Sequence, residues 1–224
     1  MKSLFIVTIT LISHLVSHLS FAAGMDKPVE QNAQYRVSFI ANWTSDELPV
    51  DFPSNPHFSP LVGASHDGAY GLFQLGSSST DGLRDVAETG STTQLLRELR
   101  RAQNQNQVLN YRTGNGIPNG TGRSSVVLEV SREHSLLSAA TMIAPSPDWI
   151  VGFNSLRTIE NGNFINRIQI PAYAIDAGTD AGRSFSSPNR RESRRKAIKI
   201  LTEDELFIQD DRLVPFGSFV IEKI

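Results

Sequence analysis

Alternating apolar and polar residues predict a series of short β-strands. In Tyr35-Arg36-Val37-Ser38-Phe39-Ile40, large apolar side chains occupy every second position, which is typical of a strand with one buried face. Further strand-like segments, separated by turns rich in Gly and Pro, lie at residues 126–130, 136–143, 149–153, 164–170 and 216–224. This succession of short strands predicts a two-sheet antiparallel β-sandwich.

Two segments instead repeat their apolar residues at helical intervals. Asp81 is the expected cap of a first short helix, and Ser91 with Gln94 has the spacing of a capping box that begins a second. Residues 42–68 and 112–125 are dense in Pro, Gly, Asn and Ser and are expected to form loops. The chain is therefore predicted to be mainly β, with one or two short helices in its connections.

The N-terminal residues have the pattern of an export signal. Lys2 precedes the apolar run 4–12, and Ser20-Phe21-Ala22 places small residues at the positions that a signal peptidase reads. We predict a signal peptide at residues 1–22 and a single exported domain at residues 23–224. The apolar run is too short to span a bilayer, and no later segment approaches the ~20 apolar residues that a spanning helix needs. An uncleaved signal that anchors the chain is the alternative.

Composition narrows the classes of protein further. The chain has 224 residues, no cysteine and a formal net charge of −2. A chain of this length can bury a core without disulfides, and the absence of cysteine excludes a disulfide-rich module. A near-neutral exported protein gives no general argument for nucleic-acid binding. The partner is therefore expected among proteins or glycans.

Three aspartates stand at positions where the chain turns sharply. Asp148 follows Pro145-Ser146-Pro147, and Asp176 and Asp180 lie in a segment with glycines at 178 and 182. Three carboxylates within ~5 Å would repel by about 3 kcal/mol per pair at an effective dielectric of 20, and a divalent cation reverses that sign. Calcium suits loop carboxylates because it takes six to eight oxygens and tolerates irregular geometry. By spacing alone, solvated turns are the alternative.

Several blocks of the chain resemble the spondin domain, the N-terminal module of F-spondin and mindin. The blocks are YRVSFIANWT, FPSNPHFSPLVGASH, GLRDVAETG, IAPSPDWIVG and DAGTDAGRSFSSPN, in the family's order. The resemblance implies a C2-like β-sandwich with one calcium site at its loop end. The acids of the family's PSPDW and DAGTDSG blocks fall on Asp148, Asp176 and Asp180, with Ala181 where the family often has Ser.

Glu129 is a further candidate on a different kind of element. It lies in a predicted strand, on the face opposite to Val126, Leu128 and Val130. An equivalent Glu occurs in some family members, so Glu129 is expected as a fourth metal ligand or as part of a surface for a partner. A solvent-facing strand residue is the alternative.

The consecutive residues Ser65-His66-Asp67 are not expected to form a hydrolase triad, because neighbours along the chain cannot adopt that geometry. His57 lies close by in sequence, but no third His or Cys has zinc-ligand spacing. Both histidines are interpreted as structural.

Residues 190–199 carry six basic side chains in ten. Such a run is typical of a solvated face, and an anionic partner such as a sulfated glycan or acidic lipid is the alternative. Asn42 and Asn119 fit the glycosylation sequon, and whether they are modified depends on the host.

Together these observations favour an exported calcium-binding module without catalysis, which acts in adhesion or in recognition of a protein or glycan at a cell surface or in a matrix. Because no thrombospondin-type repeat follows Ile224 in this sequence, the animal family's partners do not carry over directly. One alternative is a metal-dependent hydrolase of the cell envelope, which would need an open coordination position and a general base. Another is a structural envelope protein whose acids bind nothing.

Overall fold

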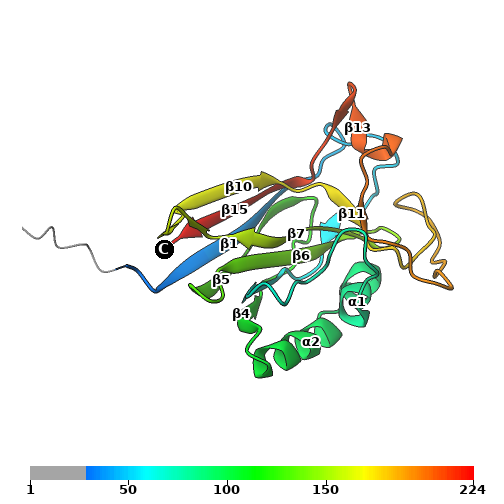
Figure 1. Ribbon diagram of the computed structural model, residues 1–224. Coiled ribbons are helices and arrows are strands. Elements are labelled where there is room, and N and C mark those ends of the chain that lie inside the picture. Colours follow the sequence, from blue (N-terminus) through cyan, green and yellow to red (C-terminus); the bar gives the residue numbers. More distant parts are fainter. Residues whose placement is uncertain (1–28) are drawn as a thin grey trace, which may run out of the picture.

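The computed structural model describes residues 29–224, and these fold into two antiparallel sheets packed face to face (Figure 1). The predicted signal peptide at residues 1–22 lies outside the described residues. The first sheet has four strands, and its order across the sheet is β10 (Arg167–Pro171), β15 (Gly217–Lys223), β1 (Asn32–Asn42) and β5 (Thr121–Ser131).

The second sheet contains seven strands and lies between the first sheet and the two helices. Its order is β12 (Lys199–Ile200), β11 (Ala174–Asp176), β7 (Trp149–Arg157), β6 (Leu136–Ala144), β3 (Val62–His66) and β4 (Val108–Thr113), with β2 (His57–Phe58) paired to β6. Two small hairpins complete the β structure: β8 (Ile159–Glu160) with β9 (Asn163–Phe164), and β13 (Ile208–Gln209) with β14 (Arg212–Leu213). A 3-10 helix, η1, spans Glu205–Phe207.

The alternation seen in the sequence produces the core between the sheets. Tyr35, Val37 and Phe39 of β1 are fully buried, whereas Arg36 is exposed, as a period of two requires. The Phe39 ring lies 4.9 Å from that of Phe58 on β2, and this aromatic contact joins the two sheets. Within its own sheet, Phe39 lies 5.0 Å from Phe219. The predicted antiparallel β-sandwich is confirmed.

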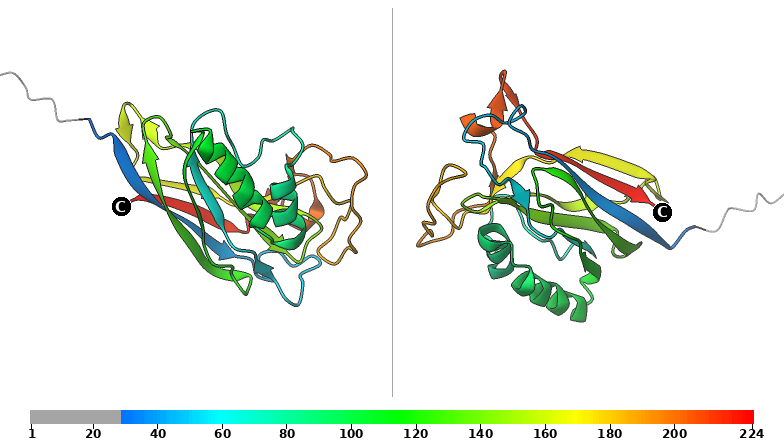
Figure 2. Two further views of the ribbon diagram at one scale, coloured as in Figure 1. Left: turned by 90° about the horizontal axis from the view of Figure 1, so that it is seen from below. Right: turned by 180° about the vertical axis from the view of Figure 1, so that it is seen from behind.

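Two helices, α1 (Asp81–Thr89) and α2 (Thr93–Asn104), cover the outer face of the seven-stranded sheet (Figures 1 and 2). Leu83, Val86, Leu95 and Leu99 are completely buried and form a second apolar cluster with residues of β3, β6 and β7. The seven-stranded sheet is therefore buried on both faces. None of the helices in the described part of the chain is long and apolar enough to cross a membrane.

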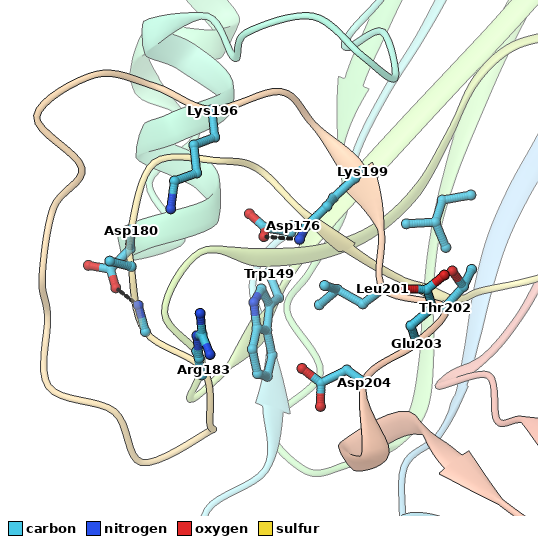
Figure 3. A pocket seen from close by; sticks show the side chains of 13 residues that line it. Trp149, Asp176, Asp180, Arg183, Lys196, Lys199, Leu201, Thr202, Glu203 and Asp204 are labelled. Atoms are coloured by element: carbon cyan, nitrogen blue, oxygen red, sulfur yellow. Dashed lines mark hydrogen bonds and ion pairs between the residues drawn. The ribbon is translucent and has the colours of Figure 1, made fainter.

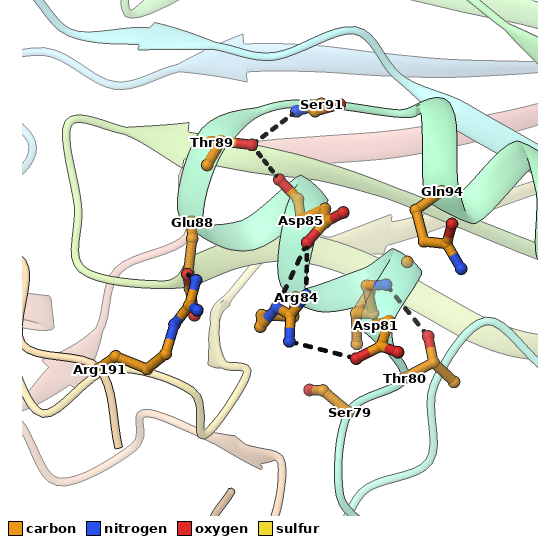
Figure 4. Close-up of polar contacts among 12 residues, drawn as sticks. Ser79, Thr80, Asp81, Arg84, Asp85, Glu88, Thr89, Ser91, Gln94 and Arg191 are labelled. Atoms are coloured by element: carbon orange, nitrogen blue, oxygen red, sulfur yellow. Dashed lines mark hydrogen bonds and ion pairs between the residues drawn. The ribbon is translucent and has the colours of Figure 1, made fainter. Parts of the chain in front are cut away.

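The helix boundaries differ from those expected. Thr80, not Asp81, caps α1, because its side chain accepts a hydrogen bond from the Leu83 amide (Figure 4). The predicted capping box of Ser91 and Gln94 is wrong: α2 has Thr92 at its N-cap position, with no side-chain hydrogen bond there. The Ser91 amide instead donates to the last turn of α1. The Ser91 backbone thus belongs to the end of α1, and Thr92 is the residue that precedes α2.

The long loop predicted at residues 42–68 contains a central strand, β3. All five residues of β3 are buried, so its two faces show no contrast between apolar and polar residues. Its small residues also lack the bulky side chains that mark a strand in the sequence. At Gly63 a small residue is required, because an added Cβ would lie 2.8 Å from the Val126 side chain. Strands β4 and β11 were likewise not predicted.

One end of the sandwich carries a long loop that joins β11 to β12. It is the gold-to-orange segment that projects beyond the sheets in Figures 1 and 2. The start of β1 and the C-terminus lie at the opposite end of the sandwich.

Candidate functional site

A rigid turn between β6 and β7 presents Asp148. The turn has the sequence Pro145-Ser146-Pro147-Asp148 and contains a cis peptide bond between Ala144 and Pro145. The Ser146 hydroxyl donates to the Ile143 carbonyl at 2.6 Å and accepts from the Trp149 amide at 3.1 Å. Because the prolines have no amide hydrogen to donate, this side chain supplies local hydrogen bonds that fix Asp148 immediately before β7.

The Asp148 carboxylate is fully buried, and its two oxygens have different surroundings. Oδ2 accepts three hydrogen bonds, from the Thr179 amide at 2.5 Å, the Thr179 hydroxyl at 3.1 Å and the Asp180 amide at 3.0 Å. Oδ1 is buried and has no hydrogen-bond partner within residues 29–224. A buried acceptor without a partner is costly, so this oxygen indicates a missing positive or donor group.

The environment of Asp148 disfavours its negative charge. Burial raises the pKa of Asp148 to about 6, which the Thr179 amide partly opposes and the nearby Asp176 charge reinforces. Such a carboxylate gains more from a bound cation than an exposed one does, because the cation replaces the lost solvation.

Asp176 is the last residue of β11 and lies opposite Trp149 on β7 and Lys199 on β12. Its Oδ1 accepts from the Gly178 amide at 2.7 Å, and its Oδ2 lies 3.9 Å from Lys199 Nζ (Figure 3). Burial raises the pKa of Asp176, opposed by the Gly178 amide and by the charges of Lys199 and Lys196. Asp176 Oδ2 therefore has only a long contact with a positive charge, that of Lys199.

Asp180 is 5 % exposed and reaches the site from the loop after β11. Its Oδ1 accepts from the Gly182 amide at 2.7 Å and its Oδ2 from the Arg190 amide at 2.6 Å. Both oxygens are thus engaged by the backbone, although a carboxylate offers about four lone-pair positions. The Asp180 amide itself donates to Asp148, so the loop and the turn before β7 are directly connected.

Glu129 lies away from these three aspartates. It is exposed on the edge strand β5, opposite Gln34 of β1. Asn42, at the far end of β1, is eight residues on, which at ~3.3 Å per residue is roughly 26 Å. Trp43, which follows Asn42, lies at the same end of the sandwich as the aspartates. Its ring packs against Phe185, which in turn packs against Trp149, the neighbour of Asp148. Glu129 is therefore placed near the opposite end of the sandwich.

The donor set was compared with the needs of a hard cation. No three His, Cys, Asp or Glu side chains in the described range 29–224 already form a group that could hold a metal ion. Two carboxylates nevertheless have an available oxygen, Asp148 Oδ1 and Asp176 Oδ2. Carboxylate oxygens supplemented by backbone carbonyls and waters are what calcium takes. The type of donor atom matches such an ion, with Asp180 adding an oxygen only if it shares one with a backbone amide.

A cavity of about 520 Å³ opens beside these acids (Figure 3). Its lining combines carboxylates, ammonium groups and one aromatic ring: Trp149, Asp176, Asp180, Lys196, Lys199 and Asp204. Thr179 and the two lysines were not identified from the sequence as neighbours of the acids. Thr179 stands inside the DAGTD block, which was the one signal available.

The basic run at residues 190–199 is partly tied to the protein itself. Arg191 forms an ion pair with Glu88 of α1 at 2.8 Å (Figure 4). Arg195 donates to the Ser79 carbonyl at 2.6 Å and pairs with Asp81, and Lys196 pairs with Glu192 at 2.5 Å. Two of the six basic side chains, Arg191 and Arg195, therefore hold the loop against α1, while Arg191, Lys196 and Lys199 remain largely exposed to solvent.

His57 and His66 form hydrogen bonds with nearby groups of the protein. His66 is fully buried, with Nε2 2.7 Å from the Ser138 hydroxyl and Nδ1 2.6 Å from the Asp67 carbonyl. His57 Nδ1 lies 2.8 Å from the Asn55 carbonyl. Both His66 nitrogens are occupied, which agrees with the interpretation that Ser65-His66-Asp67 is not a triad.

Comparison with known proteins identifies relatives of this chain. Residues 33–213 match the Spondin_N family. The chain is 37% identical to Spondin-2 of Rattus norvegicus over 161 residues, which cover 70% of this chain and 49% of that protein. It is 36% identical to Spondin-2 of Homo sapiens over the same shares, and 32% identical to Spondin-1 of Xenopus laevis over 92% of this chain and 28% of that protein. The chain spans about half the length, or less, of these relatives. Since the family match covers most of its residues, the chain belongs to the Spondin_N family.

Proposed function

We propose that this chain is an exported, calcium-binding recognition module without catalysis, which attaches to a protein or glycan at a cell surface or in a matrix. One observation carries the proposal: the fully buried Asp148 has a carboxylate oxygen without a partner in the described chain, and it lies close enough to Asp176 for their charges to interact. A divalent cation would supply a close positive charge to Asp148 Oδ1, which has no partner, and to Asp176 Oδ2, whose nearest ammonium group is 3.9 Å away.

The chemistry of the donors favours calcium over other biological metals. The candidate ligands are oxygens of Asp148, Asp176 and Asp180, with no cysteine in the whole chain. Zinc in proteins prefers Cys and His. Magnesium requires a near-ideal octahedron, whereas calcium accepts irregular shells that include backbone carbonyls. The bound ion would supply charge neutralisation and would join the turn before β7 to the loop after β11.

A structural role for the ion follows from where the ligands lie. Asp148 is fixed by the turn at Ser146, and Asp180 belongs to the loop that projects beyond the sandwich. An ion shared by both would order that loop and the surface it presents, because metal-binding free energy adds to folding free energy. The relatives' names, Spondin-1 and Spondin-2, place this chain in a family.

Thermal unfolding with and without calcium tests this function. At a free calcium concentration about 100-fold above Kd, binding to one site stabilises the native state by about 2.7 kcal/mol. For a domain of this size that corresponds to a rise in Tm of about 5–11 °C over the value in chelator. Asp176→Ala should remove most of this rise, whereas the matched loss of a carboxylate in Glu129→Gln should leave it intact.

A wild-type Tm that is the same in calcium and in chelator would contradict the proposal. So would an Asp176→Ala variant that keeps the full calcium-dependent rise. Magnesium at the same concentration serves as the control for a general ionic effect, and it should produce a smaller rise because the irregular shell does not suit it.

A further inference from the structure

The cavity beside the aspartates has a nearly balanced and unusual set of charges. Four carboxylates line it, those of Asp176, Asp180, Glu203 and Asp204. Three cationic side chains face them: Arg183, Lys196 and Lys199. The formal charge of the lining is therefore −1, and one divalent cation on the aspartates changes it to +1. The sign of the cavity depends on whether the metal is bound.

The three cationic side chains are exposed enough to reach a ligand, although Lys196 also pairs with Glu192 at 2.5 Å. Lys199 Nζ is 3.9 Å from Asp176 Oδ2, which is beyond hydrogen-bond distance. Its side chain is 65% exposed, and that of Lys196 is 66% exposed. Arg183 is exposed and forms no ion pair within the described part of the chain. Figure 3 shows these side chains around the same space as Asp176 and Asp180.

A bound cation would also change what Lys199 does. In the metal-free site Lys199 is the nearest positive charge to Asp176. A divalent ion on Asp176 takes over that role and repels the ammonium group. Lys199 then becomes available to an anion at the cavity, together with Lys196 and Arg183.

The remaining lining indicates what kind of anion fits. Glu203 and Asp204 stay as hydrogen-bond acceptors on the far side of the cavity (Figure 3), and Asp204 also accepts from the Leu206 amide. Carboxylates of this kind repel a ligand that carries only anionic groups, but they accept hydrogen bonds from hydroxyls. The volume of about 520 Å³ lies within the range of small-ligand sites. Trp149, Ile200 and Leu201 add an apolar wall.

We propose that this cavity binds an acidic sugar unit of a glycan, with its sulfate or carboxylate on Lys196, Lys199 and Arg183 and its hydroxyls on Glu203 and Asp204, and that it does so only when the metal is bound. This inference rests on the proposed calcium site and adds the class of ligand. It differs from a general attraction to the basic run, because Arg191 and Arg195 are engaged with α1.

Calorimetric titration with a heparin-derived sulfated hexasaccharide, in calcium and in chelator, tests the proposal. Binding is expected in calcium and should weaken at least about tenfold in chelator. Lys199→Gln should weaken it by up to about fivefold, the equivalent of one exposed ion pair, and Lys196→Gln/Lys199→Gln by more. Arg194→Gln is the matched control, since it removes the same charge from the same exposed loop but does not line the cavity. It should change the affinity by less than about twofold.

The outcomes separate this inference from the proposed function. If calcium itself does not bind, the proposed function fails and this inference fails with it. If calcium binds but the hexasaccharide binds equally in chelator, or Lys199→Gln behaves like Arg194→Gln, the inference fails and the calcium site stands. Equal binding of a neutral dextran fragment, or of polyglutamate, would overturn the assignment to an acidic sugar.

Discussion

The pH dependence of stability in the metal-free protein is the most revealing consequence of the buried Asp148. The pKa of this carboxyl is raised from an ordinary 3.8 to about 6, chiefly by burial. Each pKa unit corresponds to about 1.4 kcal/mol, so ionised Asp148 costs the native state about 3 kcal/mol when no cation is bound. Full burial of the residue means that solvent screening does not reduce this cost.

The sign follows from which state holds the proton. Below pH ~4 the carboxyl is protonated in both the native and the unfolded state, so the cost is absent. Between pH 4 and 6 the unfolded chain loses its proton while native Asp148 keeps it, so the free energy of unfolding falls as pH rises. Above pH ~6 both states are ionised, and the loss has reached its full value of about 3 kcal/mol.

Asp148→Asn isolates this contribution because asparagine has nearly the same shape and does not titrate. Urea unfolding in chelator, measured from pH 3.5 to 7.5, gives the free energy of unfolding for both proteins. The difference between wild type and variant should change by about 3 kcal/mol across this range, with wild type losing stability relative to the variant. Any constant cost of the substitution cancels from this change. Asp46→Asn, at an exposed carboxylate, is the control and should show no comparable change.

Calcium should stabilise wild type relative to the Asp148→Asn variant. At pH 7.5 a saturating concentration should stabilise wild type and leave Asp148→Asn nearly unaffected, because the variant lacks the anionic ligand. Parallel pH profiles of wild type and Asp148→Asn in chelator would refute the reasoning. They would mean that the buried carboxylate carries no electrostatic cost that a cation could relieve.

Two further predictions concern the loop and the surface. Gly178→Ala should destabilise the protein by at least about 1–3 kcal/mol, because Gly178 has a φ of +73° and an added Cβ would lie 2.4 Å from the Lys196 carbonyl oxygen. Gly162→Ala is the control, since Gly162 has a similar φ of +77° but open space around it. In urea unfolding it should lower the free energy of unfolding by less than Gly178→Ala does. Equal losses in the two variants would contradict a close approach of Gly178 to the Lys196 carbonyl. Glu129→Gln should leave the calcium Kd unchanged in a direct titration, and a weakened Kd would show that Glu129 belongs to the site after all.

The sequence predicted those parts of the fold whose residues alternate in character. Strand β1 was evident because Tyr35, Val37 and Phe39 face the core while Arg36 faces solvent. Helix α1 was evident from the helical spacing of its apolar residues, and the structure shows that Gly90 ends it with a left-handed φ of 71°. Strand β3 was missed because both its faces are covered, and its polar residues Ser65 and His66 are satisfied inside the protein. When neighbouring elements cover both faces of a strand, its sequence has no alternation of apolar and polar residues by which to predict it.

The candidate site also has parts that the sequence predicted and parts that it did not. Asp148, Asp176 and Asp180 were identified from their blocks, and the turn and the loop that carry them do meet at one end of the sandwich. Glu129 was placed in a strand correctly, but its distance from the aspartates depends on the register between β5 and β1. The approach of Lys199 to Asp176 depends on the pairing of β12 with β11. Both features arise from strand pairing between segments far apart in the sequence, which local patterns do not encode.

Direct calorimetric titration of calcium into the metal-free chain tests the central claim, that Asp148, Asp176 and Asp180 hold one divalent cation. The account predicts a stoichiometry of one ion per chain for wild type and loss of that binding in Asp148→Asn. The absence of binding to a folded wild-type chain, or an unchanged isotherm in Asp148→Asn, would contradict it.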